Sequence, residues 1–138
     1  MSKRTSILLL AAFALWRGAP AWAHHSFAAE YDANKPITLK GTVVKMDWVN
    51  PHSWLHIAVK DKDGKTVEWN CETAPPNILY RGGWRKTSLK EGDEVTVEGF
   101  QAKDNSATMS AQNVTTADGK RMFAGSAESP GASKNGDK

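Results

Sequence analysis

Residues 37–48 read ITLKGTVVKMDW, a stretch in which apolar side chains alternate with polar ones. The apolar members are Ile37, Leu39 and Val43 in the first half and Val44, Met46 and Trp48 in the second. A period of two is typical of a β-strand with one buried face. The change of phase between Val43 and Val44 predicts a β-bulge, which would bend this long strand around the corner of a small barrel.

Four further strands and one short helix are expected after this strand. Alternating segments predict strands at 53–60, 66–73, 94–101 and 108–115. Pro75 and Pro76 can open a helix that extends through Arg81, because proline is tolerated in a first helical turn. The sequence therefore predicts an all-β fold, a small five-stranded OB-like Greek-key barrel with one short helix between strands 3 and 4. An open sandwich and an SH3-like barrel are the alternatives.

The first 23 residues have the pattern of an export signal. Two basic residues, Lys3 and Arg4, precede an apolar run at 7–16, and Ala21-Trp22-Ala23 fits a cleavage site. An apolar run of this length spans about 15 Å, half of a hydrocarbon core of about 30 Å. We therefore expect cleavage after Ala23, a periplasmic or secreted location, and no stable membrane insertion after cleavage.

Four segments are expected along the chain. They are a signal peptide at 1–23, an N-terminal arm at 24–36, the OB-like β-barrel domain at 37–124 and a disordered tail at 125–138. We expect the tail to be disordered because it has no large apolar side chain.

The positive charge of the chain belongs to the expected signal. The chain has 18 basic and 15 acidic residues and a net charge of +3. The excess equals the signal's three cations, Lys3, Arg4 and Arg17, so the processed chain is charge-balanced. Affinity for nucleic acid depends on an excess of cations that displace counterions from phosphates. No nucleic acid is therefore expected as a partner.

The sequence contains no recognised catalytic motif, whether a nucleophile elbow, an HExxH helix, a phosphate-binding glycine loop or a dinucleotide fingerprint. The single cysteine, Cys71, shares a strand face with Trp69 and Val67 and is expected to be a buried small hydrophobe. We therefore expect a protein that is not an enzyme.

All four histidines lie between positions 24 and 56, and cleavage after Ala23 would make His24 the first residue. An N-terminal histidine offers its α-amine and its imidazole to one metal ion. A second imidazole completes a nitrogen set suited to Cu(II), the hypothetical cofactor. The candidate ligands are His24 as the chelating residue and His52 as the second nitrogen donor, with His25 or His56 as substitutes. On a regular strand, His52 and His56 lie about 13 Å apart, so only one of them should ligate unless the turn at Pro51 continues through Ser53.

Ordinary structural roles are the alternative for these residues. In that case His24 and His25 belong to a flexible start of the processed chain. His52 is a turn residue, and His56 is a strand residue that packs against Trp54. A second functional hypothesis uses Trp54 and Trp48 as a surface that recognises a small ligand or an envelope protein.

Several motifs together resemble a family of small exported bacterial proteins of unknown function. They are HHSFAAEYD at 24–32, GTV at 41–43, WVNPH at 48–52, PN at 76–77, RGGW at 81–84 and LKEGDEV at 89–95. The resemblance implies a secreted or periplasmic OB-like β-barrel without an assigned activity. Cys71 departs from it, since an aromatic or aliphatic residue is expected there. The paired HH start and WVNPH motif agree with a joint site, and equally with an arm that packs across the barrel mouth.

These observations predict an exported, non-enzymatic binding or accessory module that holds Cu(II) through its mature N-terminal histidine. The alternative is a metal-free recognition domain that uses the tryptophan-bearing face of the barrel.

Overall fold

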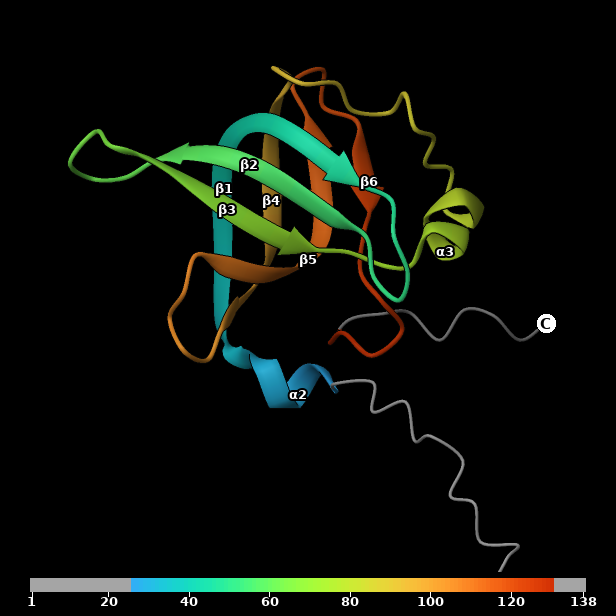
Figure 1. Ribbon diagram of the computed structural model, residues 1–138, viewed down its shortest axis with the longest axis horizontal. Coiled ribbons are helices and arrows are strands. Elements are labelled where there is room, and N and C mark those ends of the chain that lie inside the picture. The colour runs from blue at the N-terminus through green and yellow to red at the C-terminus, as the bar shows by residue number, and fades with distance from the viewer. Residues whose placement is uncertain (1–25, 131–138) are drawn as a thin grey trace, which may run out of the picture.

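Figure 1 shows the computed structural model of the chain, which describes residues 26–130. The elements are α2 (Phe27–Glu30), β1 (Tyr31–Asp47), β2 (Trp54–Lys60), β3 (Thr66–Glu72), α3 (Pro76–Arg81), β4 (Glu94–Ala102), β5 (Thr108–Thr116) and β6 (Arg121–Phe123). The expected signal at 1–23 and the two histidines His24 and His25 lie outside the described residues. Within 26–130, no helix is long and apolar enough to cross a bilayer.

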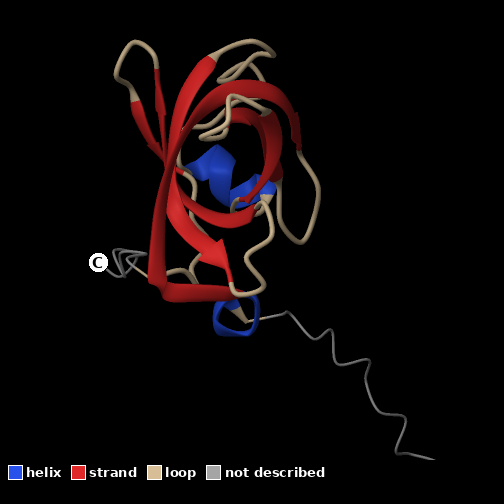
Figure 2. Cartoon of the chain, turned by 90° about the vertical axis from the view of Figure 1, so that its left-hand side faces the viewer, coloured by secondary structure: helices blue, strands red, loops and turns tan. Residues whose placement is uncertain are grey.

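The six strands form one sheet in the order β3-β2-β1-β4-β5-β6, and the neighbours in this order are antiparallel. An additional parallel pairing joins β3 to β5, so that hydrogen bonds run in a ring through five strands. Figure 2 shows the strands curving around this ring. The structure is mostly β, and it contains the five predicted strands and the predicted helix between the third and fourth. The short strand β6 and the helix α2 add to the predicted elements.

The predicted β-bulge is present in β1. Val43 pairs with Ile57 of β2, and Lys45 pairs with the preceding residue of β2, His56, so Val44 is the extra residue. Because side chains alternate along a strand, one extra residue moves the following apolar side chains back to the inner face. Met46 accordingly packs against the core although it is out of phase with Val43.

The core lies inside the ring and is closed at one end by α3. Fully buried side chains include Leu55, Ile57 and Val97 from the strands and Leu79 from α3. Figures 1 and 2 place α3 across one end of the ring. The buried indole of Trp84, just beyond α3, donates a hydrogen bond from Nε1 to the carbonyl of Phe123 at 2.8 Å. This bond satisfies the one polar atom of a side chain that otherwise fills the core.

Both ends of the described chain pack against the sheet. Strand β1 begins at Tyr31, within the segment 24–36 that the sequence assigned to an arm. Residues 125–130 belong to the predicted disordered tail, yet Gly125 and Ser129 are buried, and Ser129 Oγ lies 3.4 Å from Ser110 Oγ. Small residues dock here through backbone and hydroxyl contacts, which a search for large apolar side chains does not detect. Residues 131–138 lie outside the described residues.

The close approach of β4 and β5 gives a testable prediction at Gly99. A Cβ at this position would lie 2.0 Å from the carbonyl oxygen of Ser110, so Gly99→Ala requires the two strands to separate. We expect a loss of about 1–3 kcal/mol in the free energy of unfolding, the range for overpacking of a core. Gly82→Ala is the matched control, because its Cβ would meet no atom closer than 3.4 Å. Denaturant unfolding of both variants checks this, and equal stabilities would contradict it.

Candidate functional site

The structure assembles a polar cluster from Tyr31, His52 and Glu72. His52 Nδ1 donates to one carboxylate oxygen of Glu72, and the phenolic hydroxyl of Tyr31 donates to the other. The side chains of His52 and Glu72 are 21% and 12% exposed, and Tyr31 is 4% exposed. Since a partly buried carboxylate needs hydrogen-bond donors, these three side chains fix one another.

Three separate parts of the chain supply this cluster. Tyr31 is the first residue of β1, His52 lies in the turn between β1 and β2, and Glu72 is the last residue of β3. The turn holds a cis peptide bond between Asn50 and Pro51. In the β2–β3 register Glu72 pairs with Trp54, which places it near the turn that carries His52.

Phe27 reaches the same place from α2. Its ring centroid lies 5.7 Å from that of Tyr31 and 5.6 Å from that of Phe100, so the short helix is anchored by aromatic contacts. Lys103 also donates to the carbonyl of Ala28 through its side chain. A cavity of about 10 Å³ is lined here by Phe27, Tyr31, His52, Glu72, Ser110, Ser126 and Glu128. The beginning of the described chain therefore lies beside His52.

His56 belongs to a different set of contacts, on the outer face of β1, β2 and β3. Its Nε2 lies 3.1 Å from Asp47 Oδ2, and its Nδ1 lies 3.2 Å from Glu68 Oε1 at an angle that does not make a hydrogen bond. Asp47 also accepts from Lys45 at 2.8 Å. The hydrogen bond from Lys45 is the main cause that lowers the pKa of Asp47, and His56 contributes to the same shift. His56 thus stands between two carboxylates.

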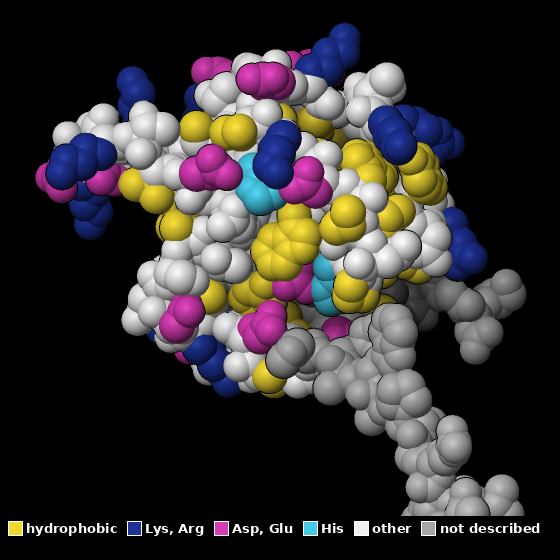
Figure 3. All heavy atoms as spheres, in the orientation of Figure 1, with side chains coloured by type: hydrophobic (Ala, Val, Ile, Leu, Met, Phe, Trp, Pro, Cys, Tyr) yellow, Lys and Arg dark blue, Asp and Glu magenta, His cyan; other side chains and the backbone are white. Residues whose placement is uncertain are grey.

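The two tryptophans that the sequence proposed as one surface have different environments. Trp54 lines a shallow cavity of about 380 Å³ together with Tyr31 and Lys103. Trp48 instead packs against the core and stacks on Tyr80, with ring centroids 5.1 Å apart. Figure 3 shows the face on which histidine side chains alternate with hydrophobic and acidic ones.

Cys71 is fully buried among core residues, as its place on the same strand face as Trp69 predicted. Burial raises the pKa of its thiol to about 12, so the thiolate needed for metal binding or nucleophilic attack is suppressed. Neighbouring positions on β3 therefore have opposite roles, with Cys71 in the core and Glu72 in the polar cluster.

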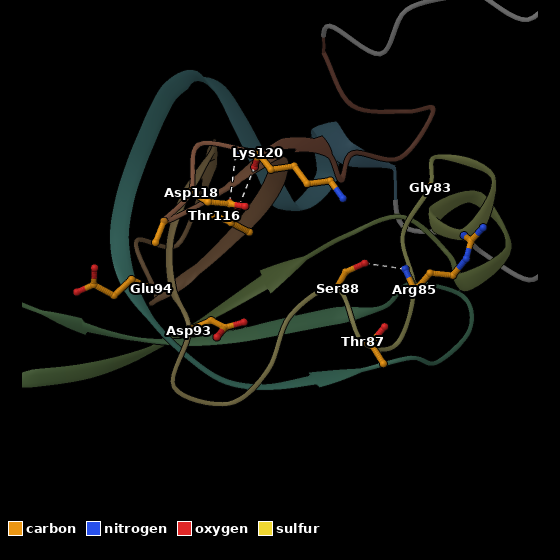
Figure 4. Close-up of a pocket in the computed structure, with 10 residues that line it drawn as sticks. Gly83, Arg85, Thr87, Ser88, Asp93, Glu94, Thr116, Asp118 and Lys120 are labelled. Atoms are coloured by element: carbon orange, nitrogen blue, oxygen red, sulfur yellow. Dashed lines mark hydrogen bonds between the residues drawn. The ribbon is translucent and has the colours of Figure 1, made fainter.

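A second cavity of about 590 Å³ lies between the loop that follows α3 and the turn between β5 and β6 (Figure 4). Its polar groups largely bind one another. Ser88 Oγ accepts from the backbone nitrogen of Arg85 at 2.8 Å, and Asp118 accepts from the side chain of Thr116. Cations and carboxylates both line it, so it does not select a charge.

Sequence reasoning missed Tyr31 and Glu72 as members of the cluster. Tyr31 lay in the expected arm, and Glu72 was one of several polar residues on an alternating strand. These two residues lie far from His52 along the sequence. Only the pairing of the strands brings them together with it. Within residues 26–130, no group of three or more His, Cys, Asp or Glu side chains is arranged to hold a metal ion.

Tyr31 gives a pH-dependent prediction. Burial, with the charge of Glu30 as a second cause, raises the pKa of Tyr31 above its ordinary value of about 10. Folding then favours the neutral phenol, so its contribution to stability is complete below about pH 10 and is lost as the pH rises further. At neutral pH we expect Tyr31→Phe to be less stable by about 1 kcal/mol, because the hydrogen bond to Glu72 is gone.

That stability difference should shrink as the pH rises above about 10, because only the wild-type protein has this phenol to ionise. Denaturant unfolding of both proteins across this pH range measures it. The burial of Cys71 also makes stability depend on pH, but it affects both proteins equally. A difference that does not change with pH would contradict the assignment.

Comparison with known proteins agrees with the resemblance noted in the sequence. The search of curated proteins found no match. A family described only as a family of unknown function, DUF6152, matches residues 13–111, which include β1 to β4, the turn that carries His52, and Glu72. Because this match covers most of the sequence, the chain belongs to the family of unknown function DUF6152.

Proposed function

We propose that this protein is an exported, non-enzymatic binding module that holds Cu(II) with the α-amine and imidazole of His24 and the imidazole of His52. The observation that carries the proposal is that Phe27 and His52 line the same cavity. His24 precedes Phe27 by three residues, which span at most about 10 Å, so a ligand at the processed N-terminus is within reach of His52.

The contact with Glu72 supports His52 as the second nitrogen donor. A carboxylate that accepts from Nδ1–H fixes the tautomer and makes Nε2 the ring nitrogen that carries the lone pair. Histidines that bind metals have such a partner on the other ring nitrogen almost without exception. Tyr31 in turn holds the second oxygen of Glu72, which orients the carboxylate.

His56 is the weaker substitute among the candidates. Its two ring nitrogens face the carboxylates of Asp47 and Glu68, on the outer face of the sheet. A metal at His56 would have to displace at least one of these contacts. His25 remains a substitute for His52 as the second nitrogen donor, because it adjoins His24 in the sequence.

We further propose that the ring of five strands is an OB-like Greek-key barrel. Three features support this assignment: β1 pairs with both β2 and β4, a parallel β3–β5 pairing closes the ring, and a helix lies between β3 and β4. The barrel would supply a rigid frame for the cluster, while the fold alone would specify no ligand.

A second candidate function is recognition of a small organic ligand without a metal. The cavity of about 380 Å³ beside Trp54 and Tyr31 favours it, because aromatic side chains beside the charged Lys103 and Asp104 suit a ligand with a flat apolar part. This function would survive His24→Ala and be lost in Trp54→Ala. The copper site would respond in the opposite way, so the two variants separate the candidates.

The test of the copper site is a Cu(II) titration of the protein that begins at His24. It is compared with a protein that carries a Gly-Ser extension, long enough that the new terminus forms no chelate with His24 or His25. We expect the extension and His52→Gln each to weaken binding at least about tenfold, because each removes a nitrogen ligand. Electron paramagnetic resonance of the bound Cu(II) should show fewer nitrogen ligands in both.

Two further variants serve as controls in this titration. His56→Gln should bind Cu(II) with unchanged affinity, since His56 is not a ligand. Glu72→Gln should weaken binding by about 10–100-fold while His52 remains, as loss of an orienting partner does. Equal affinity of the processed and the extended protein would overturn the amine-dependent site. Equal effects of His52→Gln and His56→Gln would overturn the choice of His52.

A further inference from the structure

Two of the four large hydrophobic side chains that remain exposed among residues 26–130 belong to α3, and the other two lie on segments that contact α3 or Trp84, just beyond it. The four are Val49, Ile78, Tyr80 and Phe123, which are 48%, 39%, 38% and 43% exposed. Ile78 and Tyr80 belong to α3 itself. Val49 follows Trp48, whose ring stacks on Tyr80, and the carbonyl of Phe123 accepts from the indole of Trp84. An exposed apolar group of this kind marks an interaction surface.

The segment that contains α3 is positively charged. Residues 73–90 contain four cations and no aspartate or glutamate, although the expected processed chain is balanced. The cations are Arg81, Arg85, Lys86 and Lys90, and all four are exposed. Figure 3 shows hydrophobic side chains gathered on the side where Figure 1 places α3, with Lys and Arg side chains at their border.

The surface is held in place by the fold. Leu79, on the opposite side of α3 from solvent, is buried in the core. The guanidinium of Arg85 donates to the carbonyls of Tyr80, at 3.1 Å, and Trp84, at 2.7 Å, and so fixes the end of the helix. Because these contacts fix the helix, its exposed side chains need little ordering on binding.

We propose that this α3 surface (Val49, Ile78, Tyr80 and Phe123, with the cations of 73–90) docks on a membrane that contains anionic phospholipid. Exposed aliphatic and aromatic side chains insert at the boundary between headgroups and acyl chains, where tyrosine is favoured. Cations beside them are attracted to the anionic headgroups, and this attraction falls as salt screens it. The docking is peripheral, and it uses none of the residues of the copper proposal.

The combination of charge and apolar side chains favours a membrane over an acidic protein as the occupant. An acidic protein would bind chiefly through the cations and would not need Ile78. A lipid surface needs both kinds of side chain. The same variants should therefore change binding to a membrane and binding to an acidic protein in different ways.

The experiment is cosedimentation of the protein that begins at His24 with vesicles of phosphatidylcholine alone or mixed with phosphatidylglycerol. We expect binding to the mixed vesicles, loss of binding at high salt, and little binding to pure phosphatidylcholine. The double variant Arg81→Glu, Lys86→Glu should lower the partition coefficient at least about tenfold. Ile78→Ser, which leaves the charge unchanged, should also lower it several-fold.

The matched control is the double variant Lys62→Glu, Lys65→Glu in the β2–β3 hairpin loop. This loop lies at the opposite side of the molecule from α3 (Figure 1), and both lysines are exposed. The control changes the net charge equally and should keep most of the binding. Thermal unfolding of each variant verifies that it is folded.

Two outcomes would overturn the proposal. One is equal loss of vesicle binding in the α3 and hairpin variants, which would mean attraction by net charge alone. The other is no binding to mixed vesicles together with retention on immobilised polyglutamate that Ile78→Ser does not affect, which would indicate an acidic protein partner.

Discussion

The parallel pairing of β3 with β5 is the constraint on which the rest of the structure depends. It joins Asn70, Cys71 and Glu72 to Thr108, Met109 and Ser110 and thereby closes the ring. Closure encloses Cys71 and Met109 in the core, where both are fully buried. The same pairing places Glu72 beside Ser110, and both line the cavity at His52. The candidate site is therefore built at the position where the ring closes, and an open sheet would separate its parts.

Alternation along β3 explains how one short segment serves both the core and the site. Cys71 and Glu72 are adjacent in the sequence, and the pleat directs their side chains to opposite faces. A register slip of one residue would bury a carboxylate and expose a thiol, which is costly in both respects. The hydrogen bonds from Tyr31 and His52 to Glu72 reinforce the correct register, because only that register brings the carboxylate to its two donors.

The elements that the sequence predicted are those set by local patterns. The phase change between Val43 and Val44 predicted the bulge, and the two prolines predicted α3. The alternation of apolar and polar residues along β3 predicted the buried position of Cys71. The Tyr31–Glu72–His52 cluster was not predicted, because its members lie 20 to 41 residues apart and meet only through strand pairing. Helix α2 and residues 125–130 were missed for a related reason, since their contacts are with distant parts of the sheet. The placement of His24 and His25 lies outside the described residues.

The short turn between β1 and β2 links the two proposed surfaces. It carries Val49, a member of the α3 surface, and, three residues later, His52 in the polar cluster. Trp48 is held at one end of this turn by stacking on Tyr80, and His52 is held at the other by Glu72. If α3 rests on a membrane, His52 would lie at most about 10 Å along the chain from the lipid-facing Val49. The two proposals use separate residues, and the geometry of one turn would set the distance between their sites.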